Sequence, residues 1–469
     1  MASMKSLVLL VSLSLLVSNS LVLANFHLTA GTDDGSEQWG YVEVRPKAHM
    51  FWWLYRSPHR VEDPSNPWPT ILWLQGGLEG SRVGFGNFLE IRPLDLDLKP
   101  WNSTWLTKAD LLLVDSPVGT GFNYVEDESL AVKTDEVAAT DLTAMLKALF
   151  NGNETLQKSP LFIIVESYGG KFAFSWGPLL KDLSRLDGNA LYSSNSLAQK
   201  IQQELAEEKY EDATNTWGVL EDVISVSSND VDFYNFMLDS SNDPLESRTY
   251  ESKGLMVDRY SKYMCTKIFS SINSASGLDL YTVMNGPIKQ KLKIIPENVT
   301  WDGQGAIVFP AMVGDFMKPR IKKVDKLLAK GVNVTIYNGQ IDLISATKGT
   351  EAWIDKLEWE GLKSYLNLSR TPLFCGEDNI TTKAFVRSYK NLFFYWILGA
   401  GHFVKFRAIE VQCLFLGFAV LATMSVSWLL METHCLGAVY AMSSSAADWC
   451  IVLCCCVTLA AVLKICGCL

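Results

Sequence analysis

The residues best suited to chemistry are Ser167 and the turn around it. An unbroken apolar run, Leu161-Phe162-Ile163-Ile164-Val165, stops at Glu166-Ser167-Tyr168-Gly169-Gly170, and helix-compatible sequence follows from Lys171. This order predicts a buried parallel strand, a sharp turn that carries the serine, and a helix whose N-terminal amides face the turn. A serine held in such a turn can attack a carbonyl carbon when a base and an oxyanion hole lie nearby. The turn lacks the first glycine of the usual G-x-S-x-G pattern, where Val165 stands.

Asp342 and His402 follow strand-like runs farther along the chain and could complete a triad with Ser167. Asp342 comes after the run 332–337, and His402 comes after the run 393–398. Because the carboxyl ends of parallel strands meet at one edge of a sheet, we expect the three side chains to converge there. Of the five histidines, His402 is the one in a Gly-His turn after such a run. An ordinary surface histidine is the alternative interpretation.

Alternating strand and helix patterns supply the elements that must position these residues. Apolar or alternating runs predict strands at 39–44, 49–55, 68–75 and 109–115. Apolar residues recur at helical spacing from 134 to 150, and Gly152 stands where this helix should end. Gly76 and Gly77 follow a predicted strand, where they would let a backbone amide approach a ligand closely. The alternation predicts an α/β fold with a doubly wound sheet.

Several motifs in a fixed order resemble one known family. They are Trp73-Leu74-Gln75-Gly76-Gly77, Asn87-Phe88-Leu89-Glu90-Ile91-Arg92-Pro93-Leu94, Asp115-Ser116-Pro117-Val118-Gly119-Thr120-Gly121-Phe122, Glu166-Ser167-Tyr168-Gly169-Gly170-Lys171, Tyr337-Asn338-Gly339-Gln340-Ile341-Asp342 and Ala400-Gly401-His402-Phe403-Val404. Together they resemble the serine carboxypeptidases, and most of all the branch with retinoid-inducible and plant members. The resemblance covers residues 38–405. It implies an α/β-hydrolase fold with a helical cap insertion, and the chain order Ser, Asp, His is the one found in that fold.

The resemblance also implies roles for the catalytic residues. Ser167 would attack the carbonyl carbon, His402 would act as base and then as acid, and Asp342 would orient the imidazole. The backbone amides of Gly77 and Tyr168 would hold the oxyanion. The implied reaction is release of C-terminal amino acids from a peptide substrate through an acyl-enzyme, with no metal and no cofactor.

In this family the substrate's terminal carboxylate is held by residues that match Gln75, Gly76, Glu90 and Glu166. Glu90 would pair with Glu166. Two close carboxyl groups cannot both ionise cheaply, so one keeps a proton that it can donate to the substrate. We therefore expect binding to weaken as pH rises and that proton is lost, which predicts an acidic optimum. Two solvated acids are the alternative for this pair.

Departures from the family pattern leave other functions open. After Ser175 the chain lacks the end of the elbow helix and the strand that the family places next, so we expect the sheet to lack a central strand and to expose backbone groups there. Leu78-Glu79 replaces Pro-Gly beside the oxyanion site, and Arg92 replaces a glycine near the carboxylate-binding acids. An impaired member that acts as a binding protein, or an acyltransferase, is therefore the alternative function.

Composition bounds the class of protein and its compartment. The chain has 469 residues, 48% of them hydrophobic, and a net charge of −10 without a basic run, which argues against a nucleic-acid partner. Residues 1–24 predict a cleaved signal peptide. Sequons follow at Asn102, Asn153, Asn298, Asn333, Asn367 and Asn379. Cys265 and Cys375 alone precede position 412, so the globular part holds one disulfide at most. We expect a glycoprotein of the secretory pathway, either secreted or vacuolar/lysosomal.

The predicted domains are interrupted by one insertion and end in an unusual tail. Residues 25–186 and 311–405 form the two parts of the hydrolase core, 187–310 a helical cap, and 406–469 a divergent apolar tail. Within the tail, 411–430 is uncharged and long enough to span a bilayer, and a shorter apolar stretch covers 449–463. A membrane-anchored form and a tail from an altered transcript are the alternatives. Either way, 411–430 predicts membrane association.

Overall fold

The computed structural model describes residues 26–61, 63, 67–74, 76, 81–91, 93–100, 104–166, 184–239, 279–302, 305–374, 381–402 and 450–454. The strands are β1 (Phe26–Gly31), β2 (Glu37–Arg45), β3 (Ala48–Tyr55), β4 (Thr70–Leu74), β5 (Asp110–Val114), β6 (Tyr124–Val125), β7 (Leu161–Val165), β8 (Asn333–Gly339), β9 (Thr371–Phe374), β10 (Thr382–Tyr389), β11 (Leu392–Ile397) and β12 (Cys450–Cys454). The α-helices are α2 (Asp135–Asn151), α3 (Glu154–Lys158), α5 (Gly188–Ala206), α6 (Tyr210–Ser228), α8 (Leu280–Val283), α9 (Lys289–Leu292), α10 (Val308–Phe316), α11 (Ile321–Ala329), α12 (Thr347–Ile354) and α13 (Leu362–Leu366). Other helical segments are η1 (Arg82–Glu90), η2 (Trp105–Thr107), η3 (Glu128–Leu130), η6 (Met284–Ile288) and η7 (Gly305–Ile307).

The strands form one mixed sheet in the order β1-β2-β3-β5-β4-β7-β12-β8-β11-β10-β9, with β6 paired to β3. The run from β5 to β11 is parallel throughout, and antiparallel strands flank it on both sides. Strands β4 and β5 are buried along their whole length, as expected for parallel strands covered on both faces. The predicted doubly wound α/β sheet is confirmed.

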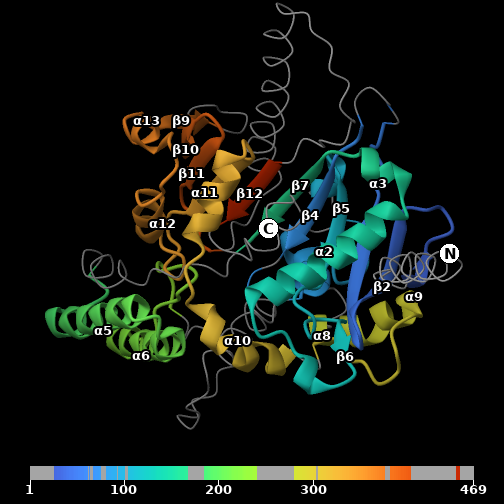
Figure 1. Ribbon diagram of the computed structural model, residues 1–469, viewed down its shortest axis with the longest axis horizontal. Helices are drawn as coiled ribbons and strands as arrows, with labels where there is room; N and C mark the ends of the chain where they lie inside the picture. Colours follow the sequence, from blue (N-terminus) through green and yellow to red (C-terminus); the bar gives the residue numbers. More distant parts are fainter. Residues whose placement is uncertain are drawn as a thin grey trace, which may run out of the picture.

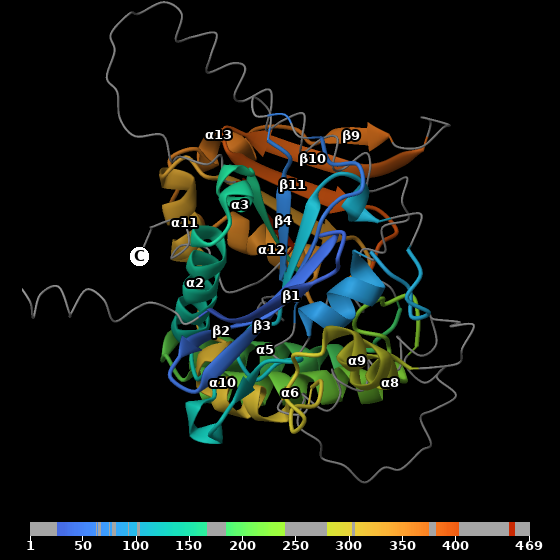
Figure 2. The same ribbon diagram turned by 90° about the vertical axis from the view of Figure 1, so that its right-hand side faces the viewer.

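Two apolar clusters, one on each face, hold the sheet between layers. One contains Leu142 and Met145 of α2 together with Leu327 and Leu328 of α11, and Figures 1 and 2 show these two helices and α3 on the same face. The other gathers residues of η1, η2 and α8 to α9 against the opposite face. Helix α2 begins at its N-cap Thr134 and ends at its C-cap Gly152, which confirms the helix predicted there.

The position beside β7, where a central strand was expected to be missing, is occupied by β12. Cys450–Leu453 pair in parallel with Phe162–Val165 of β7, and Cys450–Cys454 pair in parallel with Asn333–Tyr337 of β8. Figure 1 shows β12 in red between β7 and the β8–β11 part of the sheet. The prediction that backbone groups of β7 would be left exposed at this position is therefore wrong, since a segment from far along the chain pairs with them.

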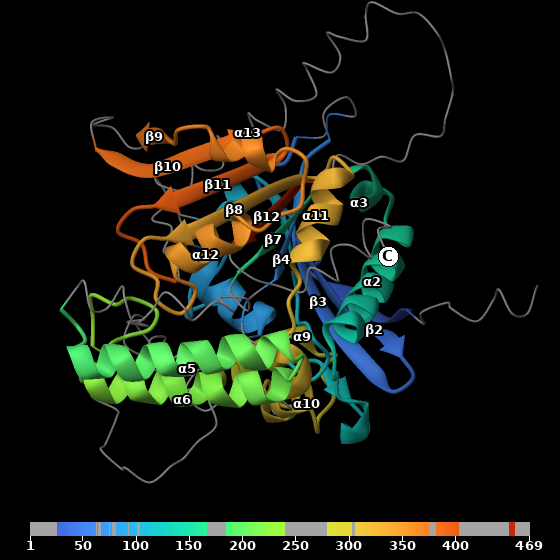
Figure 3. The same ribbon diagram turned by 60° about the vertical axis from the view of Figure 1, so that its left-hand side comes forward.

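Helices α5 and α6 form an antiparallel pair that lies below the sheet in the view of Figure 3, with α10 beside it. Ile201 of α5 and Leu220 of α6 are buried in a third apolar cluster. Leu343 and Ala346, just past Asp342, belong to the same cluster. The helical pair thus packs against the loop that carries the predicted triad aspartate.

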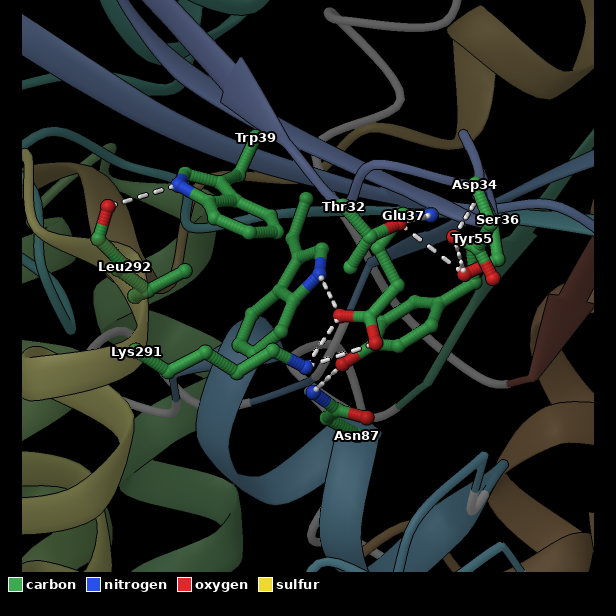
Figure 4. A network of polar contacts seen from close by, with 10 residues as sticks. Thr32, Asp34, Ser36, Glu37, Trp39, Tyr55, Asn87, Lys291 and Leu292 are labelled. Carbon is green, nitrogen blue, oxygen red and sulfur yellow. Dashed lines mark hydrogen bonds and ion pairs between the residues drawn. The ribbon is translucent and has the colours of Figure 1, made fainter.

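The short helices α8 and α9 lie elsewhere, against the first strands of the sheet. Lys291 of α9 forms an ion pair with Glu37 of β2, with its Nζ 2.7 Å from each carboxylate oxygen (Figure 4). The indole N–H of Trp53 donates to the same carboxylate at 3.0 Å, and that of Trp39 donates to the carbonyl of Leu292 at 3.0 Å. Residues 280–292, which the sequence assigns to the cap, are therefore tied to β2 and β3.

Several expectations concern residues outside those described. They include the signal peptide at 1–24, Cys265, Cys375 and the apolar segment 411–430. Among the helices in the described part of the chain, none has the length and apolar character needed to cross a membrane.

Candidate active site

The site is built where β8 and β11 end side by side. These strands are parallel neighbours in register from Val334–Leu392 to Gly339–Ile397, so the residues that follow them emerge at the same edge. The loops after the two strands then bond to each other, because the backbone N–H of Ile341 donates to the carbonyl of Ala400 at 2.9 Å. This pairing carries Asp342 and His402 toward one another.

Asp342 and His402 meet as the sequence predicts. Their Oδ2 and Nδ1 atoms are 2.9 Å apart, within hydrogen-bonding distance, and the side chains are 3% and 1% exposed. With Nδ1–H donating to the carboxylate, Nε2 carries the lone pair that a general base needs. The surface-histidine interpretation is wrong for His402.

The other oxygen of Asp342 is also fixed by the fold. Its Oδ1 accepts a hydrogen bond from the backbone N–H of Ser345 at 3.0 Å. The carbonyl of Ser345 in turn accepts from the side-chain amide of Asn338 at 2.8 Å, and the hydroxyl of Thr350 donates to the amide oxygen of Asn338 at 2.6 Å. Both carboxylate oxygens are thus held, so the side chain presents a fixed face to His402. The Tyr-Asn-Gly part of the motif contains Asn338, but its supporting role was not predicted.

A short segment after α6 links the loops that carry Asp342 and His402, and sequence reasoning did not predict this link. The carbonyl of Tyr234 accepts from the backbone N–H of His402 at 2.8 Å, and its ring meets the imidazole edge-on at 5.1 Å between centroids. The carbonyl of Phe233 accepts from the N–H groups of Leu343 at 3.0 Å and Ile344 at 2.8 Å. One turn of chain therefore holds the aspartate loop and the histidine together.

Two glycines allow these loops to approach so closely. A Cβ on Gly339 would lie 2.1 Å from the carbonyl oxygen of Gly401, and a Cβ on Gly401 would lie 2.2 Å from that of Tyr234. Both obstacles are backbone atoms, so any larger residue would push the loops apart. The glycines in the two motifs are thus required by close approach.

The chain that leads to the predicted nucleophile is described up to Glu166. Its backbone N–H donates to the carbonyl of Leu74 at 3.0 Å, which continues the β7–β4 pairing past the strand end, and the residue is only 2% exposed. This burial argues against a freely solvated acid at Glu166. Gly76, after β4, is also buried. Of the other predicted site residues, Gln75, Gly77, Ser167 and Tyr168 lie outside the described residues, as do Leu78-Glu79 and Arg92, and Glu90 is described only in its backbone.

Asp115, the residue after β5, holds the chain around it through hydrogen bonds. It is fully buried and accepts hydrogen bonds from the hydroxyl of Ser81 at 2.8 Å, the N–H of Val83 at 3.0 Å and the N–H of Phe122 at 3.0 Å. Burial raises the pKa of Asp115, and these hydrogen bonds oppose that rise. Ser81 is also the N-cap of η1, so the carboxylate ties the chain entering η1 to the Asp115–Phe122 motif.

The chain matches a family model described as serine carboxypeptidase over residues 29–176 and 180–416. It belongs to the serine carboxypeptidase family. The match skips 177–179, beside the point where the sequence predicts a missing strand.

Individual relatives agree with this membership. Serine carboxypeptidase-like 51 of Arabidopsis thaliana is 54% identical over 419 residues, which cover 81% of this chain and 90% of that protein. The retinoid-inducible serine carboxypeptidase of Mus musculus is 41% identical over 407 residues, with 79% and 88% covered. The crystal structure of a prohormone-processing carboxypeptidase from Saccharomyces cerevisiae superposes with a TM-score of 0.62 at 19% identity, over 83% of this chain and 93% of that one. That structural likeness confirms the α/β-hydrolase fold.

Proposed function

We propose that this member of the family is an active serine carboxypeptidase that releases the C-terminal residue of a peptide through an acyl-enzyme on Ser167. The observation that carries the proposal is the buried pair of Asp342 and His402, 2.9 Å apart at the edge of the sheet. A histidine whose Nδ1–H is held by a carboxylate is fixed in one tautomer and can accept a proton through Nε2. In the sequence Ser167 comes two residues after Val165, the last residue of β7, and the carboxyl ends of parallel strands meet at one edge of a sheet.

The chemistry divides into two half-reactions. The Ser167 Oγ–H transfers its proton to His402 as Oγ bonds to the carbonyl carbon, and Asp342 stabilises the imidazolium that forms. The proton then passes to the leaving amino group as the peptide bond breaks. Water repeats the sequence and releases the shortened peptide from the serine ester. In this proposal the amides of Gly77 and Tyr168 stabilise the oxyanion in both halves.

Recognition of the terminal carboxylate is assigned to Gln75, Gly76, Glu90 and Glu166. The burial of Glu166 supports this assignment, because removal of a carboxyl group from bulk solvent disfavours its ionised form. A protonated acid donates to the substrate carboxylate, whereas an ionised one repels it. We therefore expect kcat/KM for a peptide with a free C-terminus to fall as pH rises, and a C-terminal amide to be a poor substrate at every pH.

Labelling with a fluorophosphonate probe tests the nucleophile directly. The wild-type protein should react, and Ser167→Ala should not. Ser193→Ala is the matched control, since Ser193 is an exposed serine on α5. A wild-type protein that folds but does not react would leave only the binding-protein alternative. Labelling without peptide hydrolysis, but with acyl transfer to an added alcohol, would favour the acyltransferase instead.

We further propose that the protein enters the secretory pathway. The Asn298 and Asn367 sequons lie on exposed residues, where a glycan would meet no packed neighbour. N-terminal sequencing should find a mature chain beginning after Ala24. Removal of glycans by an endoglycosidase should shift the electrophoretic mobility, and Asn298→Gln and Asn367→Gln should each remove part of that shift. An uncleaved and unglycosylated product would contradict the proposal.

A further inference from the structure

Strand β12 joins the strand that precedes Ser167 to the strand that precedes Asp342. It is parallel to both, with Ile451 in register between Ile163 and Val334, and Leu453 between Val165 and Ile336. It comes from a part of the sequence that follows His402, whereas the family places the strand for this position directly after the elbow helix. Here that part of the chain is shortened after Ser175.

We propose that Cys450–Cys454 replaces the missing family strand and acts as a positioning segment for the catalytic triad. This inference rests on the proposed function for its effect on catalysis, while the placement of the strand stands on the sheet pairing alone. No residue of the segment need touch the substrate. Its role is to hold β7 and β8 at the separation that the triad requires.

The separation follows from sheet geometry. Neighbouring strands lie about 4.8 Å apart, so one intervening strand keeps β7 and β8 about 10 Å apart. Without it, either both strands would present unpaired N–H and C=O groups in the centre of the molecule, or they would pair directly and move about 5 Å closer. Catalytic groups must be held within about 0.5 Å of their productive geometry. Neither alternative leaves the serine and aspartate strands where the triad can form.

The composition of the segment suits this position. Cys-Ile-Val-Leu-Cys contains no charge, proline or glycine, which is typical of central strands in parallel sheets. The register partners of Ile451 and Leu453, which are Ile163, Val165, Val334 and Ile336, all belong to one buried apolar cluster. Val452 is in register with Ile164, which belongs to the cluster on the opposite face, and with the buried Thr335 of β8. The register partners of Ile451 and Leu453 therefore favour apolar residues on one face of the segment.

This placement also bears on the predicted membrane segment. If 411–430 crossed a bilayer once, residues after it would lie on the other side of the membrane from the hydrolase core. Residues 431–449 include Glu432 and Asp448 and are too polar to cross back. A single crossing by 411–430 and the pairing of β12 with β7 and β8 are thus mutually exclusive.

Hydrogen–deuterium exchange on the full-length glycoprotein tests the placement without reference to activity. Amides of 450–454 should exchange as slowly as those of β7 and β8. Exchange of 450–454 at the rate of an unstructured peptide, while β7 stays protected, would overturn the proposal. The exchange result is independent of catalysis. A protein that fails to react with a fluorophosphonate would contradict the proposed function, but it would leave the placement of β12 unaffected.

Two matched pairs test the positioning role. A chain that ends at Asp448 lacks β12, and a chain that ends at Cys456 keeps it. The first should label with fluorophosphonate at least 100-fold more slowly than the second, because a misplacement of about 1 Å can cost about 100-fold. A synthetic 449–456 peptide should restore part of the rate. Equal rates for the two truncated chains would refute the role.

The second pair keeps the chain at full length in case the shorter one fails to fold. Val452→Pro removes a ladder hydrogen bond in the centre of the sheet, while Val452→Ile keeps the strand. Labelling should be lost in the proline variant and retained in the isoleucine variant. Labelling of Val452→Pro at the wild-type rate would contradict the proposal.

Discussion

The pair of Asp342 and His402 gives the sharpest quantitative prediction, through the substitution Asp342→Asn. In the native site Oδ1 of Asp342 accepts from the N–H of Ser345, and Oδ2 faces Nδ1 of His402 at 2.9 Å. An asparagine has one acceptor and one donor in place of two acceptors. Because the buried N–H of Ser345 needs an acceptor, the amide oxygen should take that position and the NH₂ group should face His402.

The consequence is the wrong tautomer of the imidazole. With an NH₂ group donating to Nδ1, the ring proton moves to Nε2, which then cannot accept the proton of Ser167. The imidazolium formed during the reaction also loses its carboxylate. The equivalent substitution in a serine triad lowers kcat about 10⁴-fold. At about 1.4 kcal/mol per factor of ten, this corresponds to about 5 to 6 kcal/mol of transition-state stabilisation.

The assay is release of the C-terminal residue from a blocked dipeptide, with the fluorophosphonate labelling rate as a second measurement. The thermal midpoint should change little, because the hydrogen bonds of residue 342 are kept in number. Asp355→Asn, an exposed aspartate at the end of α12, is the control and should retain full activity. If Asp342→Asn kept more than a tenth of wild-type kcat/KM, the reasoning that Asp342 sets the tautomer of His402 would be refuted.

Further predictions concern the loops around this pair and the buried acid beside it. Gly401→Ala would place a Cβ 2.2 Å from the carbonyl of Tyr234, so we expect at least a tenfold lower kcat, whereas Gly314→Ala, with open space around its Cβ, should be neutral in the same assay. Tyr234→Phe should keep the edge-on ring contact with His402 and an almost unchanged kcat. Tyr234→Ala should lower kcat about threefold to tenfold, since such ring contacts contribute about 0.5–1.5 kcal/mol. Equal rates for the two variants would argue against an orienting role for the Tyr234 ring. Burial raises the pKa of Asp115 in the folded protein above its value in the unfolded chain, which is about 3.9. Between these two pKa values the folded protein binds more protons than the unfolded chain. The free energy of unfolding should therefore fall as pH rises through this interval. Urea unfolding between pH 4 and 7 should find that slope reduced in Asp115→Asn, together with a loss of about 1–3 kcal/mol from a buried N–H left without an acceptor; an unchanged slope would contradict the assignment.

The sequence predicted those parts of the fold that apolar pattern alone determines. β4, β5, β7 and β11 are short buried strands made almost wholly of apolar residues, and each lies within a residue or two of the predicted run. Asp342 and His402 could be placed because each follows such a strand, and parallel strands end at one edge. Local composition and one topological rule were therefore enough for two of the three proposed triad residues.

The contacts that hold the site together could not be predicted in this way. Phe233 and Tyr234 contribute backbone carbonyls to the two loops, and a carbonyl group is the same in every residue. The position of β12 was missed for a related reason. An apolar segment of five residues is compatible with any central strand position in a parallel sheet, and its sequence does not indicate which strands it pairs with.

The same lack of specificity explains how a distant segment can complete this sheet. Within the parallel run β4-β7-β12-β8-β11, the proposed triad residues follow β7, β8 and β11 in the sequence, and none of them belongs to β12. The proposed triad requires only that the intervening strand keeps β7 and β8 at the right spacing, runs parallel to both and presents apolar side chains to the core. Any segment that provides these and can reach the gap preserves the geometry, whichever end of the chain it comes from. The chemistry of the site is therefore separable from the origin of the strand beside it, and this predicts that a synthetic strand peptide added in trans can restore a catalytic centre from which β12 has been removed.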